Sequence, residues 1–167
     1  MKPTQERLKE LIVYNPLTGD FFWNVDRSNI KAGTPAGWRD RQGYLRIEVD
    51  GRECRAHHLA WLYMTGAWPE GSLDHRDLNK QNNGWSNLRL ATRSQNNANT
   101  RITSANKSGL KGVSFHAGSA KHGKPWQAHI QKDRKAMHLG TFETKEAAHA
   151  AYVTAAEKIF GEFARAA

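Results

Sequence analysis

Short stretches of alternating apolar and polar residues run through the first half of the chain, and this pattern predicts strands rather than helices. Two apolar runs, at 11–14 and 21–23, flank a turn that contains Pro and Gly, so we expect a β-hairpin there. The alternating residues 44–49 and 52–56 are joined by Asp50-Gly51, a dipeptide that favours a tight hairpin. The first half of the chain is therefore expected to contain two hairpins.

Helical spacing replaces this alternation after the second hairpin. Apolar residues at 58–63 recur at helical intervals, and the Gly and Pro that follow are typical of a helix end. The next segment, 73–92, is rich in Asp, Asn and His, and its few leucines indicate two short strands joined by a long loop. Thr92-Arg93-Ser94-Gln95 fits a capping box, which predicts a short helix that begins at Arg93.

The last third of the chain shows both periods, one after the other. Residues 111–115, 126–131 and 135–139 read as strands, and the pattern becomes helical after Gly140. Thr144 can cap that helix, whose apolar stripe is rich in alanine and allows close packing against a sheet. We predict an α+β chain that ends in a small three-stranded antiparallel sheet with one helix.

A polar stretch without periodicity, at 98–108, is interpreted as a linker between two domains. Residues 1–97 would form the first domain, with strands in 1–56 and a core at about 57–97. Residues 109–167 would form the second. A chain of 167 residues is long enough for two small domains of this kind.

The charge of the chain is unevenly distributed. The formal net charge is +9, and residues 101–167 contain 11 Lys and Arg against five Asp and Glu. This excess indicates a polyanionic partner, although a merely solubilising surface charge is equally compatible with it. The single cysteine, Cys54, excludes an intramolecular disulfide framework and a thiolate metal cage. No signal-peptide core or membrane-length apolar run is present, so we expect a soluble cytoplasmic protein with no membrane partner.

The segment rich in Asp and Asn contains side chains that suit phosphodiester hydrolysis, which needs a base for water and a cation for the charged oxygens. His75 has an ordinary pKa that suits a base near neutral pH, and Asp74 beside it offers an anionic oxygen for a cation. Asn96 adds an amide oxygen. Because such oxygen ligands suit hard cations, the set favours Mg²⁺ or Mn²⁺ over Zn²⁺. Any single Asn here is also an ordinary turn residue.

The segment as a whole is more specific than any single residue, because both the residue types and their spacing form a pattern. The pattern consists of Leu73-Asp74-His75-Arg76-Asp77-Leu78-Asn79-Lys80-Gln81-Asn82-Asn83, Ser86-Asn87-Leu88-Arg89, Ala91-Thr92 and Gln95-Asn96-Asn97. These residues strongly resemble the His-Asn-His (HNH) endonuclease family, and most closely its phage and intron-homing branch. The preceding Arg55-Ala56-His57-His58-Leu59-Ala60-Trp61 is similar to the same branch. The resemblance implies a ββα-metal fold, in which two strands and a helix surround one divalent cation.

The resemblance also implies roles for individual residues. His75 would be the general base, Asp74 a metal ligand, and Asn87 the residue that orients His75 through a hydrogen bond. Asn96 stands where the family has its final His and would be the second ligand, a substitution that occurs in the homing branch. The His57-His58 pair can act as base and ligand elsewhere in the superfamily. Here it begins an apolar helix, and a structural role is favoured.

A second resemblance covers residues 106–167. It is carried by Ser108-Gly109-Leu110-Lys111-Gly112-Val113, Gly123-Lys124-Pro125-Trp126-Gln127-Ala128-His129-Ile130, His138-Leu139-Gly140-Thr141-Phe142, Glu146-Ala147-Ala148-His149-Ala150-Ala151-Tyr152 and Gly161-Glu162-Phe163-Ala164-Arg165. These residues resemble the Apetala-type, or ethylene-response-factor (ERF), DNA-binding domain, whose sheet lies in the major groove. The DNA-facing positions implied are Lys111, Ser114, Lys124, Trp126, His129, Gln131 and His138, with Arg134 and Lys135 on phosphates. Core packing is an equal reading for Trp126.

Together the two resemblances imply a metal-dependent DNA endonuclease, namely a site-specific homing or nicking enzyme of phage origin acting in the host cytoplasm. Its partner would be double-stranded DNA, without a small-molecule cofactor. The alternative is a DNA-binding regulator with a vestigial nuclease site, against which the intact set of Asp74, His75, Asn87 and Asn96 argues. The target sequence, nicking versus double-strand cutting, monomer versus homodimer, and the role of residues 1–56 stay open.

Overall fold

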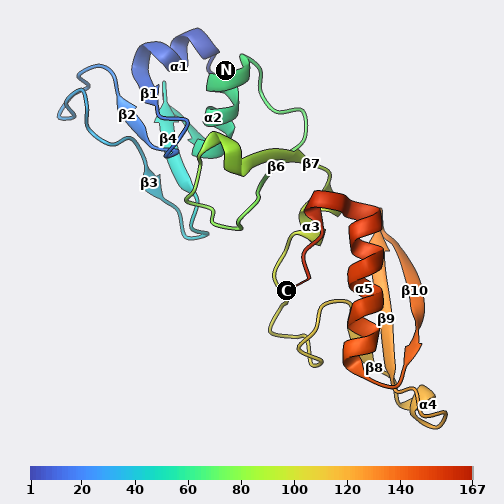
Figure 1. The fold of residues 1–167 in the computed structure, drawn as a ribbon. Coiled ribbons are helices and arrows are strands. Elements are labelled where there is room, and N and C mark those ends of the chain that lie inside the picture. The colour runs from blue at the N-terminus through green and yellow to red at the C-terminus, as the bar shows by residue number, and fades with distance from the viewer. Residues whose placement is uncertain (167) are drawn as a thin grey trace. The chain divides into compact units, whose positions relative to one another are not determined.

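The computed structural model describes residues 1–166 and divides the chain into two compact units, Met1–Ala91 and Thr92–Ala167 (Figure 1). Each unit mixes helices and strands around a hydrophobic core of its own, so each is described by itself. The helix expected to begin at Arg93 belongs to the second unit, whereas the sequence interpretation grouped it with residues 1–97. In the described part of the chain, no helix has both the length and the apolar character needed to cross a membrane.

The first unit begins with a helix and a hairpin. Helix α1 (Gln5–Leu11) is capped by the hydroxyl of Thr4, which accepts a hydrogen bond from the Arg7 amide. It leads directly into β1 (Ile12–Tyr14), which pairs antiparallel with β2 (Phe21–Trp23) as the apolar runs predict. The sequence pattern did not indicate α1, because the helix is short and buries only two of its residues, Leu8 and Leu11.

A second sheet follows, in the order β3-β4-β5. It consists of β3 (Trp38–Arg39), β4 (Leu45–Val49) and β5 (Arg52–Arg55), all antiparallel. The turn residues between β4 and β5, Asp50 and Gly51, both have positive φ angles, of 49° and 75°, as a tight two-residue hairpin requires. The second predicted hairpin is therefore present, with β3 added to its edge.

Helix α2 (Ala56–Thr65) continues from β5 and ends at Gly66, which adopts a left-handed conformation with φ of 79°. One face of α2 packs into the core of the first unit with α1, the β1–β2 hairpin and β4. The fully buried members of this core are Leu8, Ile12, Phe21, Ile47, Val49, Leu59 and Leu62. The core thus forms a base on which the polar segment after α2 is built.

That polar segment forms a small two-stranded sheet. Strand β6 (Ser72–His75) pairs antiparallel with β7 (Leu88–Ala91), and the loop between them contains the 3₁₀ turn η1 (Trp85–Asn87). The register places Asp74 opposite Arg89 and His75 opposite Leu88. Because neighbours on a strand point to opposite faces, Asp74 and His75 have different surroundings.

The second unit starts with α3 (Arg93–Ala98), whose predicted capping box between Thr92 and Gln95 is present in both directions. Its sheet has the order β10-β9-β8, from β8 (Val113–Phe115), β9 (Trp126–Lys132) and β10 (Lys135–Phe142), with the short α4 (Ala117–Ala120) before β9. Helix α5 (Lys145–Phe160), capped by Thr144, packs against the three strands and is followed by the turn η2 (Gly161–Phe163) (Figure 1).

Strand β10 extends to Phe142, beyond the residues 135–139 expected from the alternation. A register shift between His138 and Gly140 interrupts the alternation, which is why the sequence pattern stops short of the strand end. Strand β8 begins later than expected, at Val113, because Gly112 has a φ of 72° and lies directly against the Tyr152 ring.

Candidate functional site

Asp74 and His75 lie at the end of β6, and both are buried, with 4% and 6% of their surface exposed. A titratable side chain is rarely this buried unless a partner holds it. For Asp74 the partner is the cross-strand residue Arg89, and for His75 it is Asn83 in the β6–β7 loop. The hydrolytic candidates are therefore fixed in position by the fold of the first unit.

The His75 ring has its Nε2 atom 3.3 Å from the amide oxygen Oδ1 of Asn83. Burial lowers the pKa of His75 below its ordinary value, and the hydrogen bond to Asn83 opposes this shift only in part. A histidine with a lowered pKa is neutral at neutral pH and can accept a proton. The protonation state of His75 therefore suits the general base predicted from the sequence.

Asn87 has a different position from the one expected. Within the described residues, its side chain bonds to the β6–β7 loop and not to His75: Nδ2 donates to Asp77 Oδ1 at 2.9 Å and to the Asn82 carbonyl at 2.8 Å. Its Oδ1 accepts from the Asp77 amide, and its backbone carbonyl accepts from the Arg76 amide. The sequence predicted a hydrogen bond from Asn87 to the His75 ring, but in the structure Asn83 makes that bond. Asn87 instead holds together the loop that follows His75.

Asn83 was not assigned a role from the sequence. It is only 1% exposed, although it lies in a polar loop in which most neighbours are accessible. The two adjacent Asn residues at 82 and 83 are the one signal that points to it, and they do not distinguish a turn residue from a partner of His75. Only the folded structure of the loop shows that Asn83 is the partner of His75.

Asp74 forms a buried ion pair with Arg89. Both Nε and Nη2 of the guanidinium lie 2.9 Å from Oδ2 of the carboxylate. This pair fixes the orientation of the buried carboxylate. An ionised carboxylate oxygen is a ligand that hard divalent cations prefer, so Asp74 fits the predicted role chemically.

Asn96, the other predicted ligand, lies in the first turn of α3 and is half-buried. The capping box of Thr92 and Gln95 fixes the start of this helix, and the helix belongs to the second unit. Among residues 1–166, no three His, Cys, Asp or Glu side chains gather as a metal site. The donor set predicted from the sequence is of another kind, because it combines one carboxylate with one amide oxygen.

The His57-His58 pair begins α2, and the His57 ring packs edge-on against the His75 ring with centroids 4.9 Å apart. Burial is the largest cause that lowers the pKa of His57 to about 2, so this ring stays neutral. In the described chain, its Nδ1 atom is buried without a hydrogen-bond partner. This packing agrees with the structural role that the sequence favoured for His57.

Tyr44 brings two further cations toward this cluster. Its ring lies 6.3 Å from the His75 ring, and Arg55 and Lys80 each lie 4.6 Å from its centroid. Lys80 also donates to the Gln42 carbonyl at 3.0 Å. Two positive groups beside a buried base provide an environment that attracts phosphate. The sequence interpretation had not singled out either cation.

In the second unit, α5 covers one face of the sheet and leaves the other face open. Register and burial assign Ala128 and Ile130 to the covered face, and His129, Gln131 and His138 to the open one. Ser114 lies beside this row, half-buried and paired with Gln127. Arg134 and Lys135, at the β9–β10 turn, and Lys124, before β9, are exposed. Most of the predicted DNA-facing residues therefore share an accessible surface.

Two of the predicted DNA-facing residues have other surroundings. Trp126 lies on the covered side, where its ring contacts Phe115 edge-on at 5.4 Å and packs with the core of the unit. Lys111 is half-buried, and its ammonium donates to the Ala98 carbonyl at 2.5 Å and the Thr100 carbonyl at 2.7 Å. Trp126 is therefore a packing residue, the second of the two interpretations that the sequence allowed. Lys111 holds the end of α3 by hydrogen bonds. Burial lowers the pKa of Lys111 to about 8.

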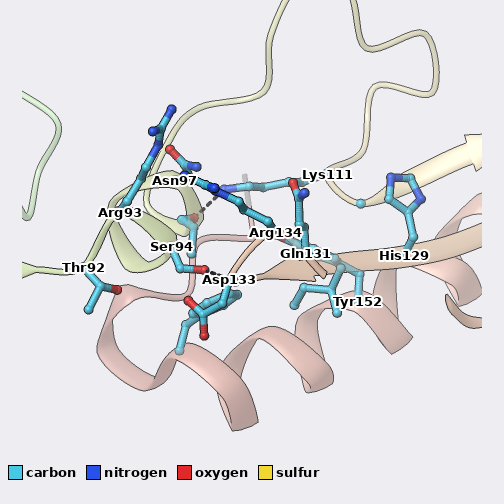
Figure 2. A pocket seen from close by; sticks show the side chains of 14 residues that line it. Thr92, Arg93, Ser94, Asn97, Lys111, His129, Gln131, Asp133, Arg134 and Tyr152 are labelled. Atoms are coloured by element: carbon cyan, nitrogen blue, oxygen red, sulfur yellow. Dashed lines mark hydrogen bonds between the residues drawn. The ribbon is translucent and has the colours of Figure 1, made fainter. Parts of the chain in front are cut away.

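An open groove of about 1000 Å³ lies between α3 and the sheet within this unit (Figure 2). Figure 2 shows Arg93, Ser94 and Asn97 of α3 on one side and Gln131 and His129 of β9 on the other. The backbone amide of Asp133, in the β9–β10 turn, donates to the Ser94 hydroxyl at 3.0 Å. The β9–β10 turn and Lys111 therefore both anchor α3 to the sheet.

Residues 54–98 match the model of a family described as HNH endonuclease, and this range includes Asp74, His75, Asn83, Asn87 and Asn96. The chain is 39% identical over 92 residues to an uncharacterized HNH endonuclease, L560, of Acanthamoeba polyphaga mimivirus, a match that covers 55% of this chain and 44% of that protein. It therefore spans less than half the length of that relative.

The chain is also 32% identical over 112 residues to protein 3.8 of Escherichia phage T7, a match that covers 66% of this chain and 88% of that protein. A solved structure of DNA binding and cleavage by the HNH homing endonuclease I-HmuI has 22% identity and a TM-score of 0.42, covering 90% of this chain and 85% of that one. The family match and the extent of the viral similarities lead to one conclusion: the chain belongs to the HNH endonuclease family.

Proposed function

We propose that the protein hydrolyses phosphodiester bonds of double-stranded DNA, with His75 as the general base and a divalent cation at Asp74. The observation that carries this proposal is the buried, neutral His75 next to the buried Asp74 on β6, whose carboxylate pairs with Arg89. Burial favours the neutral imidazole that a base needs, and the Arg89 guanidinium offsets the cost of burying the Asp74 carboxylate that a cation would need as a ligand.

In this mechanism the Nε2 atom of His75 stays bonded to Asn83 while the ring accepts a proton from water, which attacks the phosphorus in line. Asn87 keeps the β6–β7 loop closed behind the base. Arg55 and Lys80 draw the phosphate toward the site by their charge. The products would be a 5′-phosphate and a 3′-hydroxyl.

Asp74 and Asn96 are the proposed ligands of the cation, and Mg²⁺ or Mn²⁺ is the proposed ion. When bound, the cation neutralises charge on the leaving 3′-oxygen and on the phosphoryl group. The oxygen donors of both side chains support a hard ion, with phosphate and water as additional ligands. Arg89 holds the Asp74 carboxylate in place for this role.

We further propose that the second unit is an ERF-type DNA-binding domain that reads DNA with the open face of its sheet. The accessible row of His129, Gln131 and His138 supports base contacts, since sheets can enter the major groove. The exposed Lys124, Arg134 and Lys135, together with Arg93 in the groove, support phosphate contacts. Ser114 at the edge of that face completes the proposed set.

The sequence resemblance to the homing branch supports a site-specific homing or nicking enzyme of phage origin. One proposed active site per chain favours nicking unless the protein dimerises. Such an enzyme would act in the cytoplasm of the host, where its DNA target lies.

The test is the cutting of supercoiled phage or host DNA with Mg²⁺ or Mn²⁺ by the full chain and by His75→Ala. Loss of the base should slow cleavage by roughly 10²–10⁴-fold without loss of DNA binding. His122→Ala, at an exposed position, is the matched control and should cut normally. Nicked versus linear product decides strand number. Tight binding without cleavage on any substrate would instead identify a DNA-binding regulator, and cleavage that survives His75→Ala would refute this choice of base.

A further inference from the structure

Every polar group of Asn83 has a partner, although the residue is almost completely buried. Its side-chain Oδ1 contacts His75 Nε2 at 3.3 Å, and its Nδ2 donates to the Gln81 carbonyl at 3.2 Å. Its backbone amide donates to the same carbonyl at 3.1 Å, and its own carbonyl accepts the Tyr14 hydroxyl at 2.7 Å. Two hydrogen bonds of the side chain and two of the backbone therefore hold the amide in one orientation.

The orientation of this amide decides the tautomer of His75. Nδ2 can only donate and is committed to the Gln81 carbonyl, so the atom that faces His75 is the carbonyl oxygen Oδ1. That oxygen can only accept. In a neutral imidazole, Nε2 must therefore carry the proton, and the lone pair lies on Nδ1.

We propose that Asn83 is the positioning residue that holds His75 in the Nε2–H tautomer and so makes Nδ1 the atom that accepts the proton from water. This inference rests on the proposed function of His75 as general base. Under this proposal Asn83, rather than Asn87, orients His75, although the family pattern suggested Asn87. Asn87 keeps the β6–β7 loop closed. The wrong tautomer would present an N–H group to water and could not act as a base.

The β1–β2 hairpin holds Asn83 in place, which assigns a task to part of the N-terminal segment. The Tyr14 hydroxyl reaches the Asn83 carbonyl, and the Trp85 amide donates to the Pro16 carbonyl at 2.8 Å. Gly19, with φ of 83°, lies so close to the loop that an added Cβ would be 2.4 Å from the Gly84 nitrogen. The backbones of the hairpin and the loop are therefore in direct contact, and the space at Gly19 does not admit a side chain.

A purely structural role for Asn83 makes a different prediction. If Asn83 only fills space, its replacement would lower stability and leave the tautomer and the turnover of the remaining folded protein unchanged. If Asn83 sets the tautomer, its replacement changes which nitrogen of the His75 ring carries the proton. The decisive measurement is therefore the position of the imidazole proton, which is read without any cleavage assay.

The experiment compares the full-length protein with Asn83→Leu and Asn83→Asp, each labelled with ¹⁵N-histidine. Two-bond ¹H–¹⁵N spectra at about pH 8, above the ordinary titration range of imidazole, report which nitrogen of His75 carries the proton. His75→Gln identifies the signal. We expect the Nε2–H form alone in the natural protein and in Asn83→Asp, which retains an acceptor, and a mixture of tautomers in Asn83→Leu.

Cleavage should follow the same order. We expect kcat to fall by about 10²-fold in Asn83→Leu, with DNA affinity unchanged, and to be restored to within about tenfold in Asn83→Asp. An Asn83→Leu protein that keeps the Nε2–H form and its rate would overturn the inference. Failure of the proposed function looks different, because the natural protein would then show the Nε2–H form and yet not depend on His75 for cutting.

If Asn83→Leu does not fold, the hydroxyl of Tyr14 offers a milder test. Tyr14→Phe removes only the hydrogen bond to the Asn83 carbonyl, and Tyr63→Phe removes a hydroxyl from the ring packed against Tyr14 at 5.5 Å. We expect a second tautomer and a several-fold lower kcat in Tyr14→Phe and neither change in Tyr63→Phe. Equal behaviour of the two variants, with the Nε2–H form retained in both, would contradict the inference.

Discussion

The two units carry their functional candidates in opposite environments. In the first unit, Asp74, His75 and Asn83 are between 1% and 6% exposed, and each is held by a buried or half-buried partner. In the second unit, His129, Gln131 and His138 lie on an open sheet face and are exposed to solvent. The same chain therefore buries polar groups in one place and displays them in another.

The difference corresponds to the physics of the two proposed tasks. A base and a metal ligand must be held in one protonation state and one orientation, and removal from water with a fixed partner achieves both. Contacts to a duplex must reach a polyanion many ångströms across, so these side chains have to remain accessible. Substitutions should accordingly act on stability and rate in the first unit, and on DNA affinity and its salt dependence in the second.

The largest effect is expected at the buried ion pair. Arg89→Met leaves the Asp74 carboxylate buried without its cationic partner, and the N-terminal unit should lose about 3–5 kcal/mol of unfolding free energy. Lys31→Met breaks the exposed pair with Asp26, 2.8 Å apart, and should leave the unfolding free energy nearly unchanged. Denaturant unfolding of both variants measures the contrast, and similar losses would mean that burial of the pair has no energetic consequence.

A smaller effect is expected where the β1–β2 hairpin meets the β6–β7 loop. Gly19 and Gly43 both have φ of 83°, so an added Cβ strains both backbones by about 1–2 kcal/mol. Only at Gly19 would the Cβ also meet the loop backbone, which should add about 1–3 kcal/mol. We expect Gly19→Ala to be the less stable of the two in thermal unfolding and to cut DNA more slowly. Gly43→Ala should cut normally, and equal rates would contradict the bracing of the loop.

The smallest effect separates two lysines of the second unit. Lys111→Met removes hydrogen bonds to the end of α3 and should destabilise this unit by about 1 kcal/mol while the salt dependence of DNA binding is unchanged. Lys135→Met removes an exposed charge and should weaken DNA binding, lowering the slope of log affinity against log salt by about one. DNA titrations at several salt concentrations measure both, and a lower slope in Lys111→Met would restore Lys111 as a DNA-facing residue.

Much of the local structure followed from the sequence because it depends on neighbouring residues. The alternation around Asp50-Gly51 predicted the β4–β5 hairpin, and the pairing of Thr92 with Gln95 predicted the start of α3. Helix α1 was missed because its two buried leucines are too few to set a period. The end of β10 was missed because the bulge between His138 and Gly140 interrupts the alternation.

The candidate site was found only in part, for a related reason. Residue type and spacing identified Asp74 and His75, since a carboxylate next to an imidazole within a long matching motif is informative by itself. The same motif offered several Asn residues and assigned the orienting role to Asn87, whereas the structure has Asn83 on the ring. The sequence did not indicate that Arg89 pairs with Asp74, because only the strand register places the two residues opposite each other.

The sequence by itself determined the candidate chemistry of this protein: the proposed base, the proposed carboxylate ligand, the basic C-terminal part and the family pattern are properties of residue identity and spacing. Only the tertiary structure decided which Asn binds His75, which lysine supports a helix and which loop the N-terminal hairpin contacts. These depend on contacts between distant residues, such as Tyr14 and Asn83, 69 positions apart. Such contacts arise from packing around a shared core, and no local pattern encodes them.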